Sequence, residues 1–162
     1  MIKKQILDAI SMNSRRSTED LAAMLNTGTD TIEHEIKEME DNKVICGYPT
    51  LINWDRTDCE KVTALIEVKV TPQRDMGFNK VAERIYKFEE VESVYLMSGS
   101  FDLTVIIEGK SMKEVSRFVT EKLSTLEYIT STATYFVLKK YKDHGTIMVS
   151  ETDKKERQLI TP

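Results

Sequence analysis

The sequence predicts an α+β protein in which a small helical domain precedes a β-α-β-β-α-β domain. Within the first fifty residues, apolar side chains recur at helical spacing. From Val62 to Val70 apolar and polar side chains mostly alternate, as in a strand with one buried face, and helix and strand patterns then follow in turn as far as Tyr141. We therefore expect four segments: a helical domain at 1–50, a linker at 51–61, a sheet domain at 62–145 and a polar tail at 146–162.

The helical domain is expected to contain three helices and a short strand. The first helix spans residues 3–12, and Ser17 is a candidate N-cap for the second. Thr29 or Asp30 is a candidate cap for the third, which follows a Gly-containing turn. Residues 44–48, Val-Ile-Cys-Gly-Tyr, predict a strand. This order of elements is that of a winged helix-turn-helix.

The sheet domain is expected to have a ferredoxin-like order of four strands and two helices. The predicted strands are 62–70, 91–98, 103–108 and 130–141. Ser111 and Glu114 form a capping box for the second helix. If both helices cover one face of the sheet, the other face exposes Leu65, Phe136 and Leu138. An uncovered apolar face indicates a partner, so we expect a homodimer formed through the sheets.

The charge of the chain restricts any nucleic-acid surface to a local patch. The 162 residues carry a formal net charge of −4. Residues 1–50 contain 6 Lys and Arg against 9 Asp and Glu, a net charge of −3. Because contacts to phosphate need Lys and Arg, this balance predicts few of them.

The sequence contains no features typical of membrane proteins, metal-binding proteins or enzymes. No apolar run approaches the ~18 residues of a membrane span, and the N-terminus has no apolar signal core, so we expect a cytoplasmic protein without membrane contact. Cys46, Cys59, His34 and His144 show no metal-ligand spacing. Nucleophile, phosphate-loop and dinucleotide motifs are also missing, so we expect no metal, no cofactor and no enzyme activity.

The chain resembles the leucine-responsive regulatory protein (Lrp/AsnC) family from residue 5 to about residue 145. The segments that carry the resemblance lie in both halves of the chain: 5–9, 21–22, 31–32, 44–48, 99–103 and 132–134. The resemblance implies a transcription regulator that binds double-stranded DNA and forms dimers that assemble further. It also implies a small-molecule effector, an amino acid or a related metabolite, bound between C-terminal domains.

The third helix is the candidate DNA-reading element that the resemblance implies. Its candidate contacts are Thr29, Thr31, His34 and Lys37, and the candidate phosphate contacts ahead of the second helix are Arg15 and Arg16. The third helix departs from the family, which usually has Ser, Thr, Arg and Lys on the exposed face. Here that face carries four carboxylates, which would be repelled by the DNA backbone: Asp30, Glu33, Glu35 and Glu38.

The candidate effector site combines a loop with one strand. Its residues are Ser98, Gly99, Ser100, Asp102, Thr132 and Thr134. Asp102 can pair with an α-ammonium, and backbone N–H groups near Gly99 can bind a carboxylate. Thr132 and Thr134 share a strand face because they are two positions apart. The alternative is that these residues only form a turn and a strand, for which their types are also suited.

Two functions remain open on the sequence. The first is a DNA-binding transcription regulator of the Lrp/AsnC type that responds to an amino acid or related metabolite. The second is a metabolite-binding and oligomerisation protein with weak or lost DNA binding, which the net charge of −3 in residues 1–50 favours.

Overall fold

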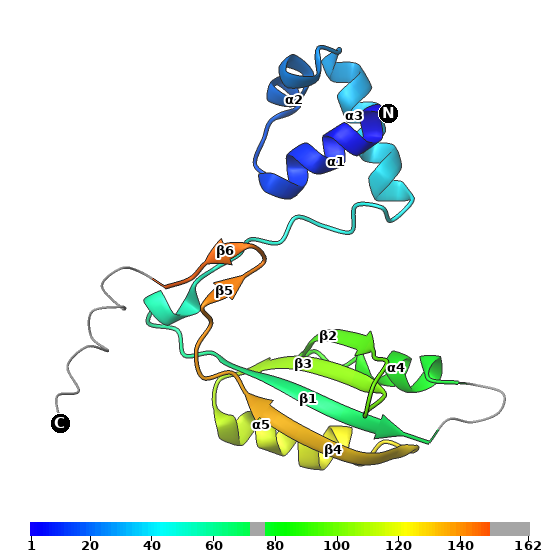
Figure 1. Ribbon diagram of the computed structural model, residues 1–162, viewed down its shortest axis with the longest axis vertical. Helices are drawn as coiled ribbons and strands as arrows, with labels where there is room; N and C mark the ends of the chain where they lie inside the picture. The colour runs from blue at the N-terminus through cyan, green and yellow to red at the C-terminus, as the bar shows by residue number, and fades with distance from the viewer. Residues whose placement is uncertain (72–76, 150–162) are drawn as a thin grey trace. The chain divides into compact units, whose positions relative to one another are not determined.

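The computed structural model describes residues 1–71 and 77–149 and divides the chain into two compact units, Met1–Leu51 and Ile52–Pro162 (Figure 1). We refer to these as the N-terminal unit and the C-terminal unit. Most of the segment expected to be a polar tail, residues 150–162, lies outside the described residues.

The N-terminal unit consists of three helices, α1 (Ile2–Met12), α2 (Thr18–Leu25) and α3 (Thr29–Asp41). Their apolar stripes meet in a small core of six buried residues, Ile6, Leu21, Ala22, Ile32, Met39 and Ile45. The predicted N-cap of α2 is confirmed, because Ser17 Oγ accepts a hydrogen bond from the Asp20 N–H at 3.1 Å. This bond satisfies one of the backbone donors left over at the start of a helix.

The predicted side-chain cap of α3 is wrong. The helix starts at Thr29, the residue that follows Gly28, and Gly28 occupies the N-cap position without a side-chain hydrogen bond. Neither Thr29 nor Asp30 occupies that position, since both lie inside the helix.

The predicted strand at residues 44–48 is also wrong. The N–H groups of Val44 and Ile45 donate to the carbonyl of Met39 at 2.8 and 3.1 Å, which closes the C-terminus of α3. Ile45 is thereby drawn into the core. A strand needs a partner for its backbone groups, and residues 1–51 contain no other strand. The wing expected after α3 is therefore not formed in this part of the chain.

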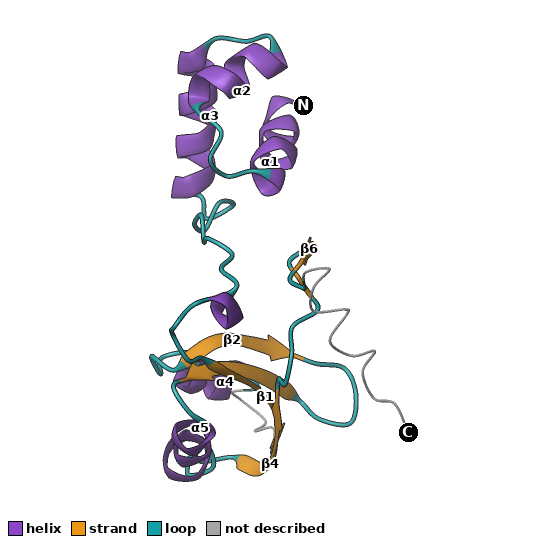
Figure 2. Ribbon diagram, turned by 90° about the vertical axis from the view of Figure 1, so that its left-hand side faces the viewer, coloured by secondary structure: helices purple, strands orange, loops and turns teal. Residues whose placement is uncertain are grey.

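The C-terminal unit is built around one antiparallel sheet with the strand order β2-β3-β1-β4. The strands are β1 (Val62–Val70), β2 (Val91–Leu96), β3 (Leu103–Gly109) and β4 (Ile129–Phe136). Two helices, α4 (Asn79–Ile85) and α5 (Met112–Phe118), lie on the same face of the sheet (Figure 2). A π-helical segment, Val119–Leu123, continues α5. This is the predicted β-α-β-β-α-β order, consistent with a ferredoxin-like domain.

The core of the C-terminal unit lies between the sheet and the two helices. Ile66 and Val68 of β1 have no exposed surface and belong to the same buried cluster as Ile85 of α4 and Phe118 of α5. The alternation predicted for residues 62–70 therefore located the β1 side of this core correctly.

The predicted capping box at the start of α5 is confirmed in part. Ser111 Oγ accepts from the N–H of Glu114 at 3.2 Å, but the Glu114 carboxylate accepts from the N–H of Lys110 at 2.6 Å and not from that of Ser111.

One residue predicted for the open face of the sheet lies on the other face. Phe136 pairs with Ala64 and packs against the helix-covered core. Its neighbour Tyr135 pairs with Leu65 on the open face and is 53% exposed. Residues in directly opposed positions project to the same side of a sheet, which is why pairing with Ala64 fixes the side of Phe136.

The fourth strand is also shorter than predicted. It ends at Phe136, so Leu138 lies beyond it. The chain then forms a small hairpin of β5 (Lys142–Asp143) and β6 (Thr146–Ile147), which the sequence analysis missed because strands of two residues show no periodicity. A 3₁₀ turn, Trp54–Arg56, interrupts the segment expected to be a linker.

Candidate DNA-binding and effector sites

The connection between α2 and α3 is a tight turn that positions α3. Asn26 ends α2 in the left-handed conformation, with φ of +50°, which Asn tolerates better than most residues. The N–H of Thr27 then donates to the carbonyl of Ala22 at 3.0 Å, and Gly28 begins the next helix. Two helices joined by a three-residue turn containing Gly form a helix-turn-helix connection.

Three of the predicted DNA contacts are exposed along α3. Thr31, His34 and Lys37 follow one another at intervals of three residues, so they lie along one strip of the helix surface. Thr29 is half-buried in the first turn of the helix. These side chains offer hydroxyl, imidazole and ammonium groups, all of which can donate hydrogen bonds to phosphates or base edges.

Two of the four carboxylates that argued against DNA binding are paired within the N-terminal unit. Lys3 Nζ of α1 lies 2.7 Å from Glu38 Oε1 and 3.5 Å from Glu35 Oε2. The hydrogen bond from Lys3 is the main reason why the pKa of Glu38 is below its ordinary value, and the same bond raises the pKa of Lys3. The negative charge of α3 is therefore partly neutralised on the side that faces α1, while Asp30 and Glu33 remain exposed.

The two arginines ahead of α2 differ in their surroundings. Arg15 is exposed, and its side chain makes no ion pair with a residue that the structure describes. Arg16 is half-buried, with its Nη1 against Met24 Sδ of α2 and its Nε buried without a hydrogen-bond partner. A thioether is a weak acceptor, so the guanidinium of Arg16 is poorly satisfied within the unit and retains capacity to donate to a phosphate.

The predicted effector loop is tied to the end of β1. The Asp102 N–H donates to the carbonyl of Val68 at 3.0 Å, and Asp102 Oδ2 accepts from the N–H of Val70 at 2.8 Å. One oxygen of the Asp102 carboxylate is thus used by the chain itself. Ser98, Gly99 and Ser100 are exposed, and no atom lies within 4 Å of the position that a Cβ of Gly99 would occupy.

The two predicted threonines lie on β4, on the other side of β1. Thr132 pairs with Val68 and Thr134 with Ile66, so both project to the helix-covered side of the sheet. Thr132 Oγ1 lies 3.3 Å from Ser124 Oγ, directly after the π-helical segment. Val68 also pairs with Leu103 of β3, the strand that follows the loop. The loop and the threonines therefore lie at the same end of the sheet. Strand β1 runs between β3 and β4, which are roughly 10 Å apart.

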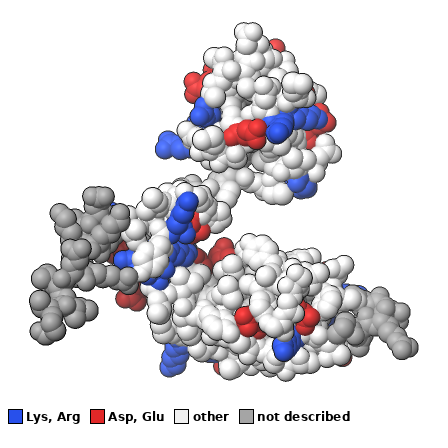
Figure 3. Space-filling model, in the orientation of Figure 1, with Lys and Arg blue, Asp and Glu red and all other residues white. Residues whose placement is uncertain are grey.

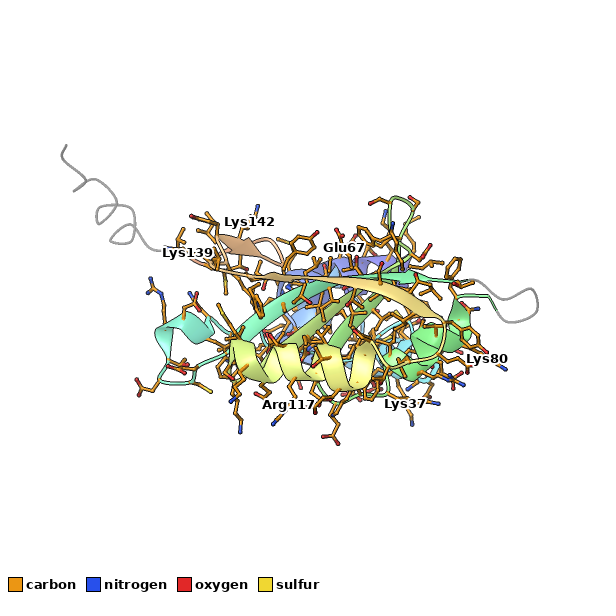
Figure 4. The ribbon with its side chains drawn as sticks, turned by 90° about the horizontal axis from the view of Figure 1, so that it is seen from below. Lys37, Glu67, Lys80, Arg117, Lys139 and Lys142 are labelled. Carbon is orange, nitrogen blue, oxygen red and sulfur yellow. The ribbon has the colours of Figure 1, made fainter. Side chains whose placement is uncertain are left out.

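The open face of the sheet also carries a hydrogen-bonded pair of side chains that could not be predicted from the sequence. Tyr135 Oη donates to Glu67 Oε2 at 3.3 Å, and Figure 4 shows Glu67 on the side of the sheet away from α5. The alternation of residues 62–70 placed Glu67 on this face, but its partner on β4 depends on the strand register, which the sequence does not reveal.

The described ranges, 1–71 and 77–149, contain neither a metal-ligand cluster nor a membrane-spanning helix. Within them, no group of three or more His, Cys, Asp or Glu residues is placed to hold a metal ion. None of their helices is both long enough and apolar enough to cross a membrane.

Comparison with known proteins assigns the chain to a class. The family model described as the Lrp/AsnC ligand binding domain matches residues 63–147. The chain is 48% identical to YugG of Bacillus subtilis, named an uncharacterized HTH-type transcriptional regulator, over 98% of this chain and 95% of that protein. These matches define a helix-turn-helix transcriptional regulator with a C-terminal ligand-binding domain, not an enzyme.

Solved structures share the fold at lower sequence identity. Escherichia coli AsnC matches with a TM-score of 0.65 and 20% identity, over 86% of this chain and 91% of that one. The transcriptional regulator NMB0573 of Neisseria meningitidis, solved as a complex with L-Met, matches with a TM-score of 0.71 and 21% identity, over 90% and 94%. The chain belongs to the Lrp/AsnC family.

The ion pair between α1 and α3 gives a first prediction. In Lys3→Met the pKa of Glu38 rises toward the ordinary glutamate value, because the carboxylate loses its hydrogen-bond donor and its positive neighbour. In Lys4→Met the pKa of Glu38 stays low, since Lys4 makes no ion pair with a described residue. NMR titration of the Glu38 side chain measures both values, and equal pKa values in all three proteins would contradict the pairing.

Proposed function

We propose that this regulator binds double-stranded DNA through α3 and the start of α2, and that an amino acid or related metabolite bound by the C-terminal unit controls this binding. The DNA contacts in this proposal are Arg15, Arg16, Thr29, Thr31, His34 and Lys37. The main support for this proposal is the strip of exposed hydrogen-bond donors on α3. Lys3 partly neutralises the acidic residues that lie next to this strip. The relatives named as helix-turn-helix regulators support the same assignment.

The proposed interface has few cations, and this determines how it should respond to salt. Arg15, Arg16 and Lys37 are the proposed basic contacts in each N-terminal unit. Each phosphate contact contributes about −0.9 to the slope of log affinity against log salt concentration. The three proposed contacts therefore contribute about −2.7 to the slope for each N-terminal unit that is bound, so two units together contribute roughly half of the value of about −10 found for a strongly electrostatic regulator.

We also propose that the C-terminal unit forms a homodimer through the open face of its sheet, with further assembly of the dimers. Leu65, Ile106 and Tyr135 lie in one row across β1, β3 and β4 on this face. Tyr95 of β2 lies in the neighbouring row and is 52% exposed. Large apolar side chains on a sheet face are stabilised by burial, and a two-fold contact would cover both sheets at once.

The effector site in this proposal consists of Ser98, Gly99, Ser100, Asp102, Thr132 and Thr134. The free oxygen of Asp102 can accept from an α-ammonium, and the exposed backbone at Gly99 can donate to a carboxylate. An amino acid carries both groups. The likeness to the regulator solved with L-Met supports an amino acid as the class of effector. If the effector binds the assembled protein more tightly than single chains, it shifts the equilibrium toward assembly.

Replacement of Lys37 tests the DNA-binding proposal. Lys37→Gln should weaken binding to a duplex from upstream of the protein's own gene and reduce the magnitude of the salt slope by about 1, because one phosphate contact is lost. The control Lys4→Gln removes the same charge from α1 and should leave the slope unchanged. Fluorescence anisotropy at several salt concentrations measures both. Absence of binding by the wild type at low salt, with and without amino acids, would favour a metabolite-binding protein that has lost DNA contact.

Replacement of Tyr135 tests the proposed dimer. Tyr135→Lys should give a monomer at micromolar concentration, because two ammonium groups would have to be buried where the sheets meet. The new Lys can pair with Glu67 in the single chain, so the fold should be retained. Ile147→Lys, on the hairpin, is the control and should keep the wild-type mass. Light scattering after chromatography measures the masses, and a monomeric wild type would refute the interface.

Replacement of Asp102 tests the effector site. Asp102→Asn retains an oxygen for the Val70 N–H but removes the charge that would pair with an ammonium. In a thermal-shift screen of the twenty amino acids, at least one should stabilise the wild type, and Asp102→Asn should lose that stabilisation. Asp143→Asn, on the hairpin, is the matched control. An amino acid that stabilises all three proteins equally would place the site elsewhere.

A further inference from the structure

The hairpin at the end of the described chain is a narrow ribbon with a tight tip. Lys142 pairs with Ile147, and Asp143 pairs with Thr146. The two residues between the strands, His144 and Gly145, both have positive φ, +41° and +81°. Positive φ at both central residues characterises the type I′ turn that joins two antiparallel strands most compactly.

The hairpin is fastened to the rest of the C-terminal unit. Asn53 Nδ2 donates to the carbonyl of Met148 at 2.8 Å, which ties the strand β6 to the segment before β1. Lys140 Nζ lies 3.8 Å from Glu108 Oε1 of β3 and 3.8 Å from Asp143 Oδ2. Since an isolated two-stranded hairpin is marginally stable in water, these contacts help to explain why so short a ribbon keeps its shape.

The hairpin and the segment that leads into it are basic. Residues 129–149 contain three lysines, Lys139, Lys140 and Lys142, and a single acidic residue, Asp143. The Asp143 carboxylate is itself engaged, since Oδ1 lies 2.9 Å from His144 Nδ1 and Oδ2 lies near Lys140. Figure 3 shows Lys and Arg side chains gathered over β5.

Two of these lysines are available to an external anion. Lys139 and Lys142 are exposed, and neither forms an ion pair with a residue that the structure describes. Figure 4 shows both at the same end of the C-terminal unit, and both follow the end of β4 at Phe136, outside the row of Leu65, Ile106 and Tyr135 that is proposed for the dimer. Lys139 Nζ also lies 5.8 Å from the centre of the Tyr141 ring, so its ammonium rests near an aromatic face.

We propose that this hairpin is a second DNA-binding surface, which holds the phosphate backbone through Lys139 and Lys142. A two-stranded ribbon has a width that suits the major groove of DNA, and ammonium groups without an ion-pair partner release counterions when they meet phosphates. The proposal rests on the proposed DNA binding by α3, and it adds two cations to the three that the N-terminal unit, with a net charge of −3 over residues 1–50, is proposed to contribute. Contacts of this kind position a protein on DNA without reading its sequence.

A pair of charge-matched double variants tests the proposal on the full chain. Lys139→Gln with Lys142→Gln removes two positive charges from the hairpin side. Lys80→Gln with Arg117→Gln removes two positive charges from α4 and α5, on the opposite face of the sheet. Affinity for a duplex from upstream of the gene and for an unrelated duplex of equal length is measured by anisotropy over a range of salt. Light scattering records the mass of each protein.

The hairpin variant should bind both duplexes roughly tenfold more weakly at low salt, on the order of the attraction of two exposed charge pairs. The magnitude of its salt slope should fall by about 1.8 for each chain that contacts the DNA, since each phosphate contact contributes about 0.9. The control variant should retain the wild-type slope and the wild-type affinity for both duplexes.

Three results would overturn the proposal, and they differ in what they mean for α3. If the wild type binds DNA and the hairpin variant keeps its slope, only the hairpin surface is refuted. If the hairpin variant loses affinity together with a fall in mass, the lysines serve a contact between copies of the chain instead. If the wild type binds neither duplex at any salt, the hairpin surface and the proposed DNA binding by α3 are both refuted.

Discussion

Strand β1 is the element on which the rest of the C-terminal unit depends. It is hydrogen-bonded to β3 on one side and to β4 on the other, and Ala64, Ile66 and Val68 on its inner face are fully buried. Because side chains alternate along a strand, a shift of one residue would exchange the buried and open faces. The register of β1 therefore decides which residues pack under the helices and which are left for a partner.

The same strand connects the proposed sensing and assembly surfaces. Val68 pairs with both Leu103 and Thr132, so the loop that ends at Asp102 and the hydroxyls of β4 are held on either side of it. Leu65, three residues earlier, lies on the open face next to Tyr135. An effector that reorders the end of β1 would act on the strand that also supplies the proposed interface. The proposed effector site and the proposed interface therefore share β1, through which ligand binding and assembly can be coupled.

The elements that depend on patterns between neighbouring residues, such as strand alternation and helix caps, could be predicted from the sequence. The alternation from Val62 to Val70 gave the bounds of β1, and Ser17 and Ser111 marked the starts of α2 and α5. The strand predicted at residues 44–48 was wrong although its β-branched residues favour a strand. A strand forms only where a second strand accepts and donates its backbone hydrogen bonds. Tertiary contacts decided its conformation.

The features of the candidate site that could not be predicted depend on residues far apart in the sequence. The pairing of Lys3 with Glu38 joins positions 35 residues apart through the packing of α1 on α3. The side taken by Phe136 followed from its pairing with Ala64, which no periodicity in residues 130–141 could reveal. Thr31, His34 and Lys37, by contrast, were candidates through the resemblance to the family, and the structure places them at helical spacing on one exposed strip.

The proposed function depends above all on contact between α3 and DNA, although the surface of this helix carries exposed carboxylates. Hydrogen–deuterium exchange of the full chain, with and without a duplex from upstream of its gene, tests this most directly. DNA should slow exchange in peptides covering residues 29–37 and leave exchange in α4 unchanged. Protection confined to the C-terminal unit, with residues 29–37 unaffected at saturating DNA, would contradict it.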